Sequence, residues 1–365
     1  MPQPSLIFIV PGRLETRTGG YEYDRRIISG LRDRGWSIQV RELEDSFPQP
    51  TAAALERADR VLSVIEDGTL VVIDGLAFGA MPEHIEHHTP RLSIVPIVHA
   101  LLANEIGIDR TTAGRYEISE RRALARAARI VVAGRVLFEP LAEYGVTRDR
   151  IAVVEPGTDR VPVARGSHDS GALHLVTVAT LNPGKGHDVL FRALATLTGH
   201  QWRLTCAGST TRHPQTAARL RSMLVELGLG DRVTLAGELD APAMASLYDS
   251  ADLFVLPTLS ETHPLSVVEA LARGLPVIST TSGAIPDLVC GSDIAGVLVA
   301  PGDVEGLASA LSHVLGDASC RRRLAEGARR VRERLPTWDD AAAKMDAALW
   351  DRLARPRSHE DTKNI

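Results

Sequence analysis

Short runs of β-branched and aliphatic residues alternate with amphipathic helical patterns along nearly the whole chain of 365 residues. This alternation is typical of β-α-β units built around a parallel sheet. Two series of six strand-like runs are present. The first series begins at Leu6, Ser37, Leu70, Leu92, Arg129 and Arg150, and the second at Leu173, Trp202, Arg232, Leu253, Pro276 and Gly296. The sequence therefore predicts an α/β protein with two Rossmann-like domains.

The segment 155–171 separates the two series, because it is rich in proline, glycine and polar residues and shows no periodicity. Such a connection could act as a hinge between two domains that close on a ligand. A helical pattern follows the second series and is expected to cross back to the N-terminal domain. The predicted divisions are an N-terminal domain over 1–160, a linker over 161–171, a C-terminal domain over 172–336, the returning helix over 337–355 and a disordered tail over 356–365.

Composition excludes several classes of protein. A formal net charge of −5 and a pI near 6.2 give no general attraction to nucleic acid or to anionic membranes. The apolar run 6–10 is too short for a secretory signal and has no basic leader. No window approaches the roughly 20 apolar residues of a membrane-spanning helix. The three cysteines fit neither a zinc site nor a disulfide framework.

We expect a cytoplasmic protein. Any contact with the inner face of the membrane would be peripheral and made by basic helices such as 119–129 or 320–335. Solvated helix faces are the favoured interpretation of these two segments.

Ligands of doubly wound sheets bind beyond the carboxyl ends of the strands, so the loops that follow strands are the places to search. Gly19 and Gly20 begin a helix, where backbone N–H groups can approach an anion or a sugar; an ordinary turn is the alternative. His99 ends a buried-looking strand, where a structural histidine is the alternative. Lys185 lies between two glycines ahead of a helix, which suits a diphosphate; a solvated lysine is the alternative.

The segment LFVLPTLSETHPLSVVEALARGLPVIST carries the densest signal in the chain. A strand ends at Leu256, a loop holds Glu261, and a helix that begins near Pro264 carries Glu269 in its second turn. Two acids at this separation could bind different parts of one extended ligand. An exposed ion pair between Glu269 and Arg273, four residues apart, is the structural alternative.

Taken together, these residues resemble the retaining glycosyltransferases of GT-B fold, family 4, also called group 1, over nearly the whole chain. The N-terminal half has the Gly-Gly loop, the histidine at a strand end and RIAVVEPGTD from Arg150. The C-terminal half has the Lys-Gly loop, CAGS at Cys206, VTLAGELD at Val233, SLYDSADLFVLPT at Ser246 and the Glu-x7-Glu element. The resemblance implies two Rossmann-like domains that face a cleft, with a nucleotide sugar on the C-terminal side and an acceptor on the N-terminal side.

The resemblance also implies roles for single residues. Glu261 would contact the donor sugar, Glu269 the ribose and Lys185 the diphosphate, while His99 would lie beside the transferred sugar. Backbone groups of Leu265 and Ser266 would meet the diphosphate, and the segment around Gly237 and Leu239 would border the base. The expected donor-binding set is completed by Gly19, Gly20, Thr180 and Gly208. The nucleotide sugar, expected to carry UDP or GDP, would be a co-substrate, with no separate cofactor and no metal; the acceptor would be a sugar, a lipid-linked or a small molecule.

Two departures from the family pattern stand out. Thr180 occupies the position where the family usually has an arginine, and Thr262, His263 and Pro264 replace Gly-Phe-Gly after the first acid. The chain contains no Asp-x-Asp motif, which argues against a divalent ion at the diphosphate. The resemblance implies sugar transfer with retention as the reaction. A nucleotide-sugar epimerase, a phosphorylase of shared fold and a degenerate nucleotide-sugar-binding protein remain the alternatives.

Overall fold

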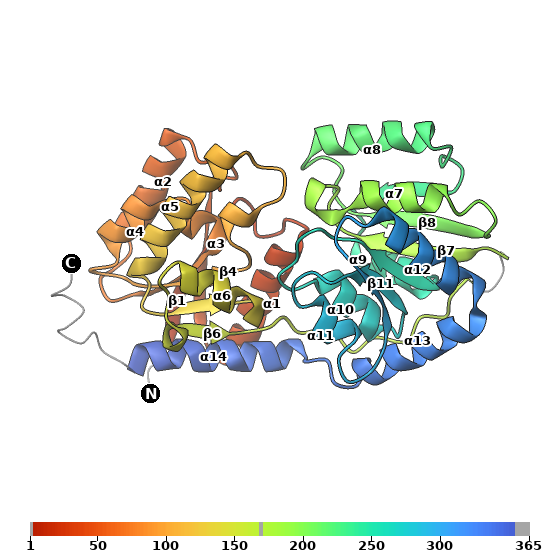
Figure 1. Ribbon diagram of the computed structural model, residues 1–365. Helices are drawn as coiled ribbons and strands as arrows, with labels where there is room; N and C mark the ends of the chain where they lie inside the picture. The colour runs from red at the N-terminus through yellow and green to blue at the C-terminus, as the bar shows by residue number, and fades with distance from the viewer. Residues whose placement is uncertain (1–2, 168–170, 355–365) are drawn as a thin grey trace. The chain divides into compact units, whose positions relative to one another are not determined.

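The computed structural model describes residues 3–167 and 171–354. Its chain divides into two compact units (Figure 1). Unit 1 contains Met1–Gly157 together with Trp338–Ile365, and unit 2 contains Thr158–Thr337. Across the described residues, no helix combines the length and the apolar composition that crossing a membrane requires.

Unit 1 is built on a six-stranded parallel sheet in the order β2-β1-β3-β4-β5-β6. All six runs predicted in the N-terminal half form strands. Buried residues such as Phe8, Ile9 and Val71 fill both faces of this sheet, which explains why its inner strands appear in the sequence as continuous apolar runs. The strands are β1 (Ser5–Pro11), β2 (Ser37–Leu43), β3 (Leu70–Asp74), β4 (Ser93–Val98), β5 (Ile130–Val132) and β6 (Ile151–Val153).

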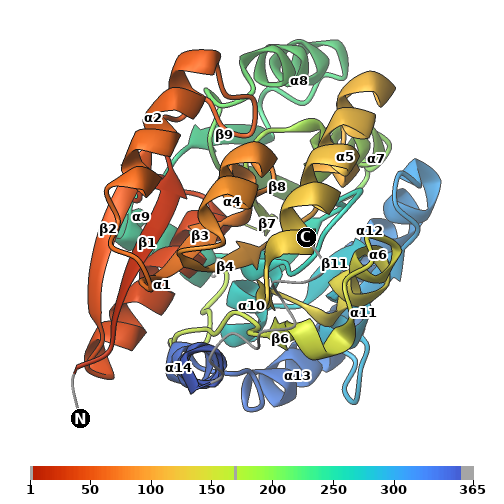
Figure 2. The same ribbon diagram turned by 90° about the vertical axis from the view of Figure 1, so that its left-hand side faces the viewer.

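Helices cover both faces of this sheet. Ile9 of β1 belongs to the core beneath α2 (Ala52–Ser63), α3 (Gly75–Phe78), α4 (Pro82–His88), α5 (Arg110–Arg126) and α6 (Phe138–Glu143). Its neighbours Phe8 and Val10 point to the opposite face, where they pack with α1 (Gly19–Asp33) and α14 (Trp338–Ala354). Figure 2 shows α2, α4 and α5 on one side of the sheet and α14 on the other.

Unit 2 repeats this plan with a parallel sheet in the order β12-β11-β10-β7-β8-β9. All six runs predicted in the C-terminal half form its strands. They are β7 (Leu173–Val178), β8 (Trp202–Ala207), β9 (Val233–Gly237), β10 (Leu253–Leu256), β11 (Val277–Thr280) and β12 (Gly296–Val299).

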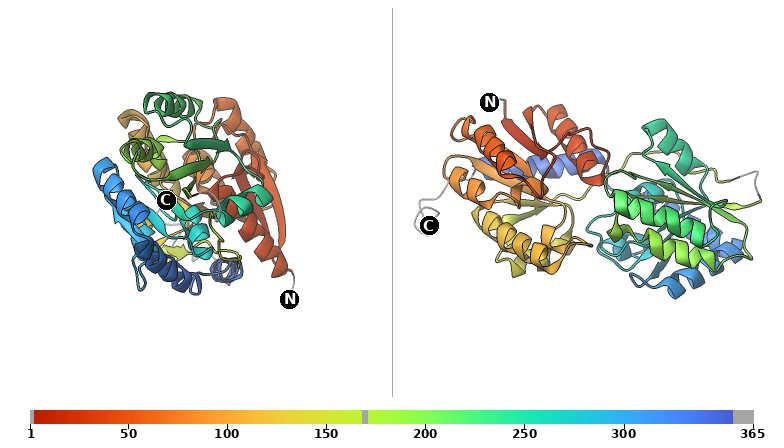
Figure 3. Two further views of the ribbon diagram at one scale, coloured as in Figure 1. Left: turned by 90° about the vertical axis from the view of Figure 1, so that its right-hand side faces the viewer. Right: turned by 90° about the horizontal axis from the view of Figure 1, so that it is seen from above.

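The helices of unit 2 also form two layers (Figure 3). One core holds the apolar faces of α7 (His187–Ala195), α8 (Pro214–Glu226) and α12 (Val304–Gly316). The other core holds those of α9 (Ala241–Asp249), α10 (Leu265–Ala272) and α11 (Ile285–Val289), and α13 (Ala318–Arg332) contributes to both.

The segments that join the units lie close against them. The contact division follows Gly157, and residues of the segment 161–171, which the sequence predicts as a linker, are hydrogen-bonded within unit 2. The amide of Ala164 donates to the carbonyl of Arg273 at 2.9 Å, and that of Ser167 to Asp252 at 3.1 Å. Helix α14 packs against α1 in unit 1, where Trp36 Nε1 donates to Asp346 at 2.7 Å. The predicted tail, 356–365, lies outside the described residues.

Both strand orders contain a topological switch point. In unit 2, β7 and β10 are neighbours, yet α7 and α10 pack on opposite faces of the sheet. In unit 1, β1 and β3 are neighbours, yet α1 packs on one face and α3 on the other. Because the connections diverge there, the carboxyl ends of these strand pairs are where a doubly wound sheet binds its ligands.

Candidate active site

Lys185 and Glu261 form an ion pair at the switch point of unit 2. Lys185 follows β7, Glu261 follows β10, and Nζ of the lysine lies 2.6 Å from Oε2 of the acid. The side chains of Lys185 and Glu261 are 25% and 13% exposed, respectively. Lys185 is therefore not the solvated lysine that was the alternative from the sequence. Two residues predicted separately, from distant segments, thus share one location.

A second set of hydrogen bonds holds the two loops together. The carbonyl of Gly184 accepts from Thr258 Oγ1 at 3.0 Å and from the amide of Leu259 at 2.7 Å. Gly283, with φ of 56°, packs so closely that an added Cβ would lie 1.7 Å from the carbonyl oxygen of Glu261. Only glycine fits this backbone and this space, so the position of the Glu261 loop depends on it.

Glu269 is held in the second turn of α10 by a buried tyrosine. The hydroxyl of Tyr248 donates to Oε2 of Glu269 at 2.9 Å. Burial raises the pKa of Tyr248 well above its ordinary value, and the charge of Glu269 raises it further, so the hydroxyl keeps its proton. The guanidinium of Arg273 lies 4.3 Å from the centre of the Tyr248 ring. Glu269 is half-buried, in contrast to the exposed ion pair that was the alternative from the sequence.

The other predicted positions of unit 2 follow neighbouring strands of the same sheet. Thr180 comes after β7, Gly208 after β8, and Leu239 after Gly237, the last residue of β9. The amide of Gly208 donates to the carbonyl of Gly237 at 2.8 Å. An added Cβ on Gly208 would lie 1.9 Å from the carbonyl oxygen of Ala179, which brings the ends of β7 and β8 together. Leu265 and Ser266 are the first two residues of α10, and Pro264 is its N-cap rather than part of its first turn.

Two histidines near the Lys185 and Glu261 loops carry buried nitrogens. His187 opens α7, and neither of its ring nitrogens has a hydrogen-bond partner among the described residues; Nε2 of His263 has none there either. Burial lowers the pKa of each to about 4, and the charge of Lys185 adds to the effect at His187. Both imidazoles are therefore neutral at pH 7.

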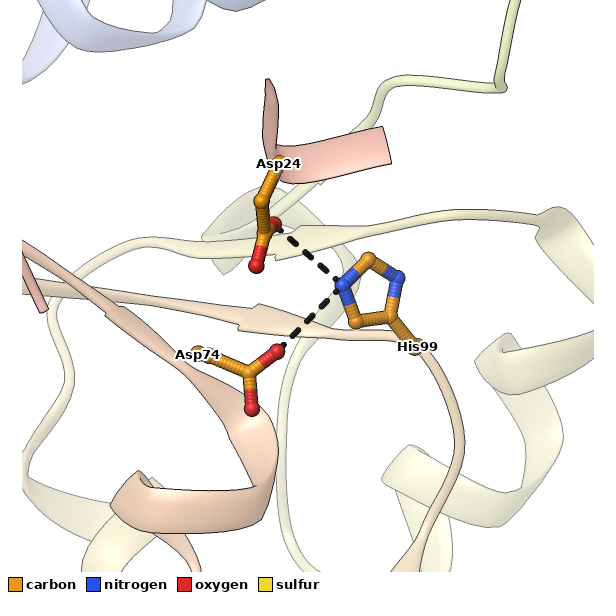
Figure 4. A group of neighbouring side chains, drawn as sticks. All are labelled: Asp24, Asp74 and His99. Carbon is orange, nitrogen blue, oxygen red and sulfur yellow. Dashed lines mark ion pairs between the residues drawn. The ribbon is translucent and has the colours of Figure 1, made fainter. Parts of the chain in front are cut away.

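The predicted residues of unit 1 lie at its own switch point. His99 directly follows β4, and Gly19 and Gly20 are the first two residues of α1. An added Cβ on Gly20 would lie 3.5 Å from His99 Cδ2, so the helix start and the imidazole are in contact distance. Figure 4 shows two further side chains on the Nε2 side of the ring. Asp24 Oδ1 and Asp74 Oδ2 each lie 3.5 Å from His99 Nε2.

The charges of this group influence one another. Burial raises the pKa of Asp74 to about 7, and the neighbouring Asp24 charge acts in the same direction, while the amide of Leu76 donates to Asp74 at 2.8 Å. Burial by itself would lower the pKa of His99, but the two carboxylates outweigh it and raise that pKa above its usual value. The three side chains thus contain a buried acid with a pKa of about 7 and a histidine whose pKa is raised above its usual value.

The comparison with known families concerns the second unit first. Residues 172–317 match the family model described as glycosyl transferases group 1. The match begins just before β7 and ends just after α12, so it contains the loops with Lys185 and Glu261. This part of the chain belongs to the group 1 glycosyltransferases.

Similarity to curated relatives extends beyond that domain. The D-inositol 3-phosphate glycosyltransferase of Xylanimonas cellulosilytica is 32% identical over 244 residues, which are 62% of this chain and 58% of that protein. The MMP alpha-(1->4)-mannosyltransferase of Mycolicibacterium hassiacum is 26% identical over 87% of this chain and 80% of its own length. Five D-inositol 3-phosphate glycosyltransferases are matched over only 48 to 61% of their lengths. The chain therefore spans about half of these curated relatives.

Solved structures match this chain over both units. Sucrose-phosphate synthase of Thermosynechococcus elongatus has a TM-score of 0.80 at 19% identity, covering 96% of this chain and 99% of its own. Anabaena HepE in complex with UDP and glucose has a TM-score of 0.75 at 15% identity, covering 95% and 100%. At these identities the likeness concerns the fold, and it confirms the predicted GT-B class of two Rossmann-like domains.

Asp24 and Asp74 were missed by the sequence reasoning, although one signal for them was present. Asp74 is the last residue of the apolar run LVVID, at the carboxyl end of a strand, where a buried acid is unusual. Because Asp74 lies within a strand, a prediction based on the loops that follow strands does not include it. Asp24 lies one turn inside α1, and nothing in the local sequence separates it from a solvated helix acid.

Proposed function

We propose that this group 1 glycosyltransferase transfers a sugar, with retention of configuration, from a nucleoside diphosphate sugar to an acceptor hydroxyl. The observation that supports the proposal most is the ion pair of Lys185 with Glu261 at the carboxyl ends of β7 and β10. A cation and an acid at that point suit a ligand that has a diphosphate on one side and a sugar on the other.

The proposed donor contacts follow the order of the strands. Lys185 and the first amides of α10, at Leu265 and Ser266, would meet the diphosphate, because the start of a helix carries partial positive charge. Glu261 would accept from sugar hydroxyls and Glu269 from the ribose. The ends of β8 and β9, at Gly208, Gly237 and Leu239, would border the nucleoside, with Thr180 beside the phosphates. In unit 1, Gly19, Gly20 and His99 would serve the transferred sugar and the acceptor.

The proposed reaction exchanges one bond for another at the anomeric carbon. The bond from this carbon to the diphosphate oxygen breaks, and a bond to the acceptor oxygen forms on the same face through an oxocarbenium-like state. The acceptor proton passes to the departing phosphate oxygen, so no separate base is needed. Positioning and charge stabilisation are then the contribution of the protein, and Lys185 with the start of α10 would take the part of a divalent ion.

The comparisons suggest which ligands to try first. Anabaena HepE was solved with UDP and with UDP-glucose, so UDP and its sugars are the first donor candidates, and GDP sugars are the second. The relatives named D-inositol 3-phosphate glycosyltransferases make inositol 3-phosphate the first acceptor candidate. Lipid-linked acceptors, together with a peripheral contact at the inner face of a membrane, are a further proposal.

A thermal-shift screen tests the donor site. UDP, GDP, ADP and dTDP, with and without their sugars, and the corresponding nucleosides would be added to the whole chain, followed by assay of nucleoside diphosphate release with candidate acceptors in EDTA. We expect one nucleotide to raise the Tm and turnover to persist in EDTA. Glu269→Ala should weaken the nucleotide effect, whereas Lys185→Ala should spare the response to the nucleoside and lose that to the diphosphate.

The control is Arg148→Ala, which removes a solvated ion pair with Glu139 in unit 1. If Lys185→Ala and Glu269→Ala respond to nucleotides like this control, the donor site is wrong. If the nucleotide sugar stabilises the chain but no acceptor leads to nucleoside diphosphate release, the chain is a binding protein. A new sugar isomer formed without acceptor would instead identify an epimerase.

A further inference from the structure

The aspartates beside His99 present an electrostatic problem that the donor site does not explain. Asp24 is fully buried, and neither of its carboxylate oxygens has a hydrogen-bond partner among the described residues. Asp74 is 3% exposed and receives one amide hydrogen bond, from Leu76. A buried carboxylate without hydrogen bonds costs several kcal/mol unless a nearby positive charge or a proton compensates it.

The compensating group in reach is the imidazole of His99. Its Nε2 lies 3.5 Å from an oxygen of each acid, and Figure 4 shows that both carboxylates approach this same edge of the ring. A proton on Nε2 would therefore interact with two acids at once. A neutral ring with a bare Nε2 would instead direct a lone pair at the two acids, which is repulsive unless Asp74 carries the proton in its place.

We infer that Asp24 and Asp74 form a carboxylate clamp that keeps the His99 imidazole protonated, so that its opposite edge offers a positively charged N–H group. That edge carries Nδ1, which Figure 4 shows pointing away from the acids. The His99 side chain remains 23% exposed although both acids are buried. The clamp is thus internal, while the cationic group that it maintains is in reach of a ligand.

The remaining neighbours leave this assignment unchanged. The titratable side chains that the structure places against His99 are Tyr23 and Asp24 from α1 and Asp74 from the end of β3. Burial raises the pKa of Tyr23 well above its ordinary value, and its hydroxyl donates to the carbonyl of Val154 at 2.9 Å. Tyr23 is therefore neutral, and its ring meets the imidazole edge-on at 5.0 Å between centres.

The clamp gives His99 a defined chemistry. An imidazolium donates from both nitrogens and cannot accept a proton, so His99 would bind an oxygen of the substrate rather than act as a general base. This consequence rests on the proposed function, in which His99 lies beside the transferred sugar. Asp24 is a positioning residue in this scheme, because it acts through His99 and not on the substrate.

Nuclear magnetic resonance of the whole chain with ¹⁵N-labelled histidine tests the clamp without any assumption about activity. The spectrum of His99→Gln identifies the His99 signals among those of the 12 histidines. In the parent, both ring nitrogens should show imidazolium shifts at pH 7 and titrate above the range usual for histidine. Asp24→Asn should move that titration to lower pH, and Asp74→Asn should move it in the same direction by less.

A matched control exists in the same unit. His88 is buried and its Nε2 lies 2.8 Å from Asp59 Oδ1, so Asp59→Asn removes a comparable acid from a different histidine. It should change the His88 signals and leave those of His99 as in the parent. If the parent His99 is neutral at pH 7, or if Asp24→Asn leaves its titration unmoved in a folded protein, the clamp is refuted.

Two further measurements separate the rival explanations. If one equivalent of Zn²⁺ or Mn²⁺ shifts or broadens the His99 signals in the parent but not in Asp24→Asn, the acids bind a cation and the clamp is wrong. With an active donor and acceptor pair, Asp24→Asn should also make turnover fall at a lower pH than in the parent. An intact NMR result in a chain that transfers no sugar would refute the proposed function and leave the clamp standing.

Discussion

In their ion pair, Lys185 and Glu261 neutralise each other's charge, and a bound ligand would otherwise meet both charges. The two charged groups are 2.6 Å apart, and both side chains are largely buried. A diphosphate that binds Lys185 must therefore compete with Glu261 for the ammonium group. Separation of the pair leaves Glu261 free to accept hydrogen bonds from sugar hydroxyls.

Glu261→Gln should strengthen the binding of UDP alone and weaken sugar transfer. The amide removes the competing charge, and a partly exposed ion pair of this kind is worth about 0.5–1 kcal/mol, which corresponds to roughly twofold to fivefold tighter binding. Titration calorimetry with UDP and turnover with the UDP sugar measure the two effects. Weaker binding of UDP by the variant would contradict the competition.

His187 should make unit 2 sensitive to acid. Its folded pKa, about 4, lies below the value of about 6.5 for an unfolded chain, so unfolding takes up a proton as the pH falls. The free energy of unfolding should therefore decline between pH 6.5 and 4. In His187→Phe, whose ring can pack on Phe191, this part of the decline should disappear in urea titrations at pH 7 and 4.5. An unchanged difference between the two pH values would count against this origin of the acid sensitivity.

At the scale of elements, the loop before α10 depends on a glycine from the next connection. Gly283→Ala should move the Glu261 carbonyl and destabilise the chain by about 1–3 kcal/mol, because both the positive φ and the 1.7 Å approach become unfavourable. UDP binding should weaken with it. Gly228→Ala is the control, since φ there is 65° but nothing lies within 4 Å of the added Cβ. If Gly283→Ala and Gly228→Ala change UDP binding equally, crowding at the Glu261 carbonyl is not the cause of the weaker binding.

The elements themselves could be predicted because their signals are local. The inner strands of both sheets lie in runs of apolar residues, since parallel strands buried on both faces must be apolar, whereas the edge strand β2 is partly exposed and contains Gln39, Arg41 and Glu42. The meeting of Lys185 with Glu261 also followed from topology, because both residues come after strands of one sheet. The pairing of Glu269 with Tyr248, and of His99 with two acids, depends on packing between distant segments, which no local pattern encodes. The segment 161–167 has no periodicity of its own because its hydrogen bonds are made with the loops of unit 2.

At the scale of the whole molecule, unit 1 should lose stability as the pH rises. Burial is the main reason why the pKa values of Asp74 and Glu120 are each raised to about 7 in the folded protein. In an unfolded chain both acids ionise near pH 4. As the pH rises, the folded state keeps these two protons after the unfolded chain has lost them. The free energy of unfolding therefore declines between about pH 4 and pH 7 and declines no further above pH 7 from this cause. Hydrogen exchange, which follows each unit separately in the intact chain, should show less protection in unit 1 at pH 8 than at pH 5.5.

Glu120→Gln should reduce this loss, because an amide can accept from the amides of Leu102 and Ala103 without a charge to bury. The matched control is Glu117→Gln on the same helix, where the acid is solvated beside Arg121. If Glu120→Gln and Glu117→Gln change the hydrogen-exchange protection equally, the pH dependence of unit 1 does not come from Glu120.

Helix α14 lies at the other end of the chain from the sheet that it covers. Ala341, Met345 and Leu349 complete the core formed by β1 and α1, so unit 2 is in effect inserted into unit 1. During synthesis, the first 157 residues leave the ribosome with one face of their sheet covered only by α1, and unit 2 has all of its strands and helices before α14 appears. The domain made first is thus the one completed last, and its exposed apolar face is what chaperones would bind in the meantime.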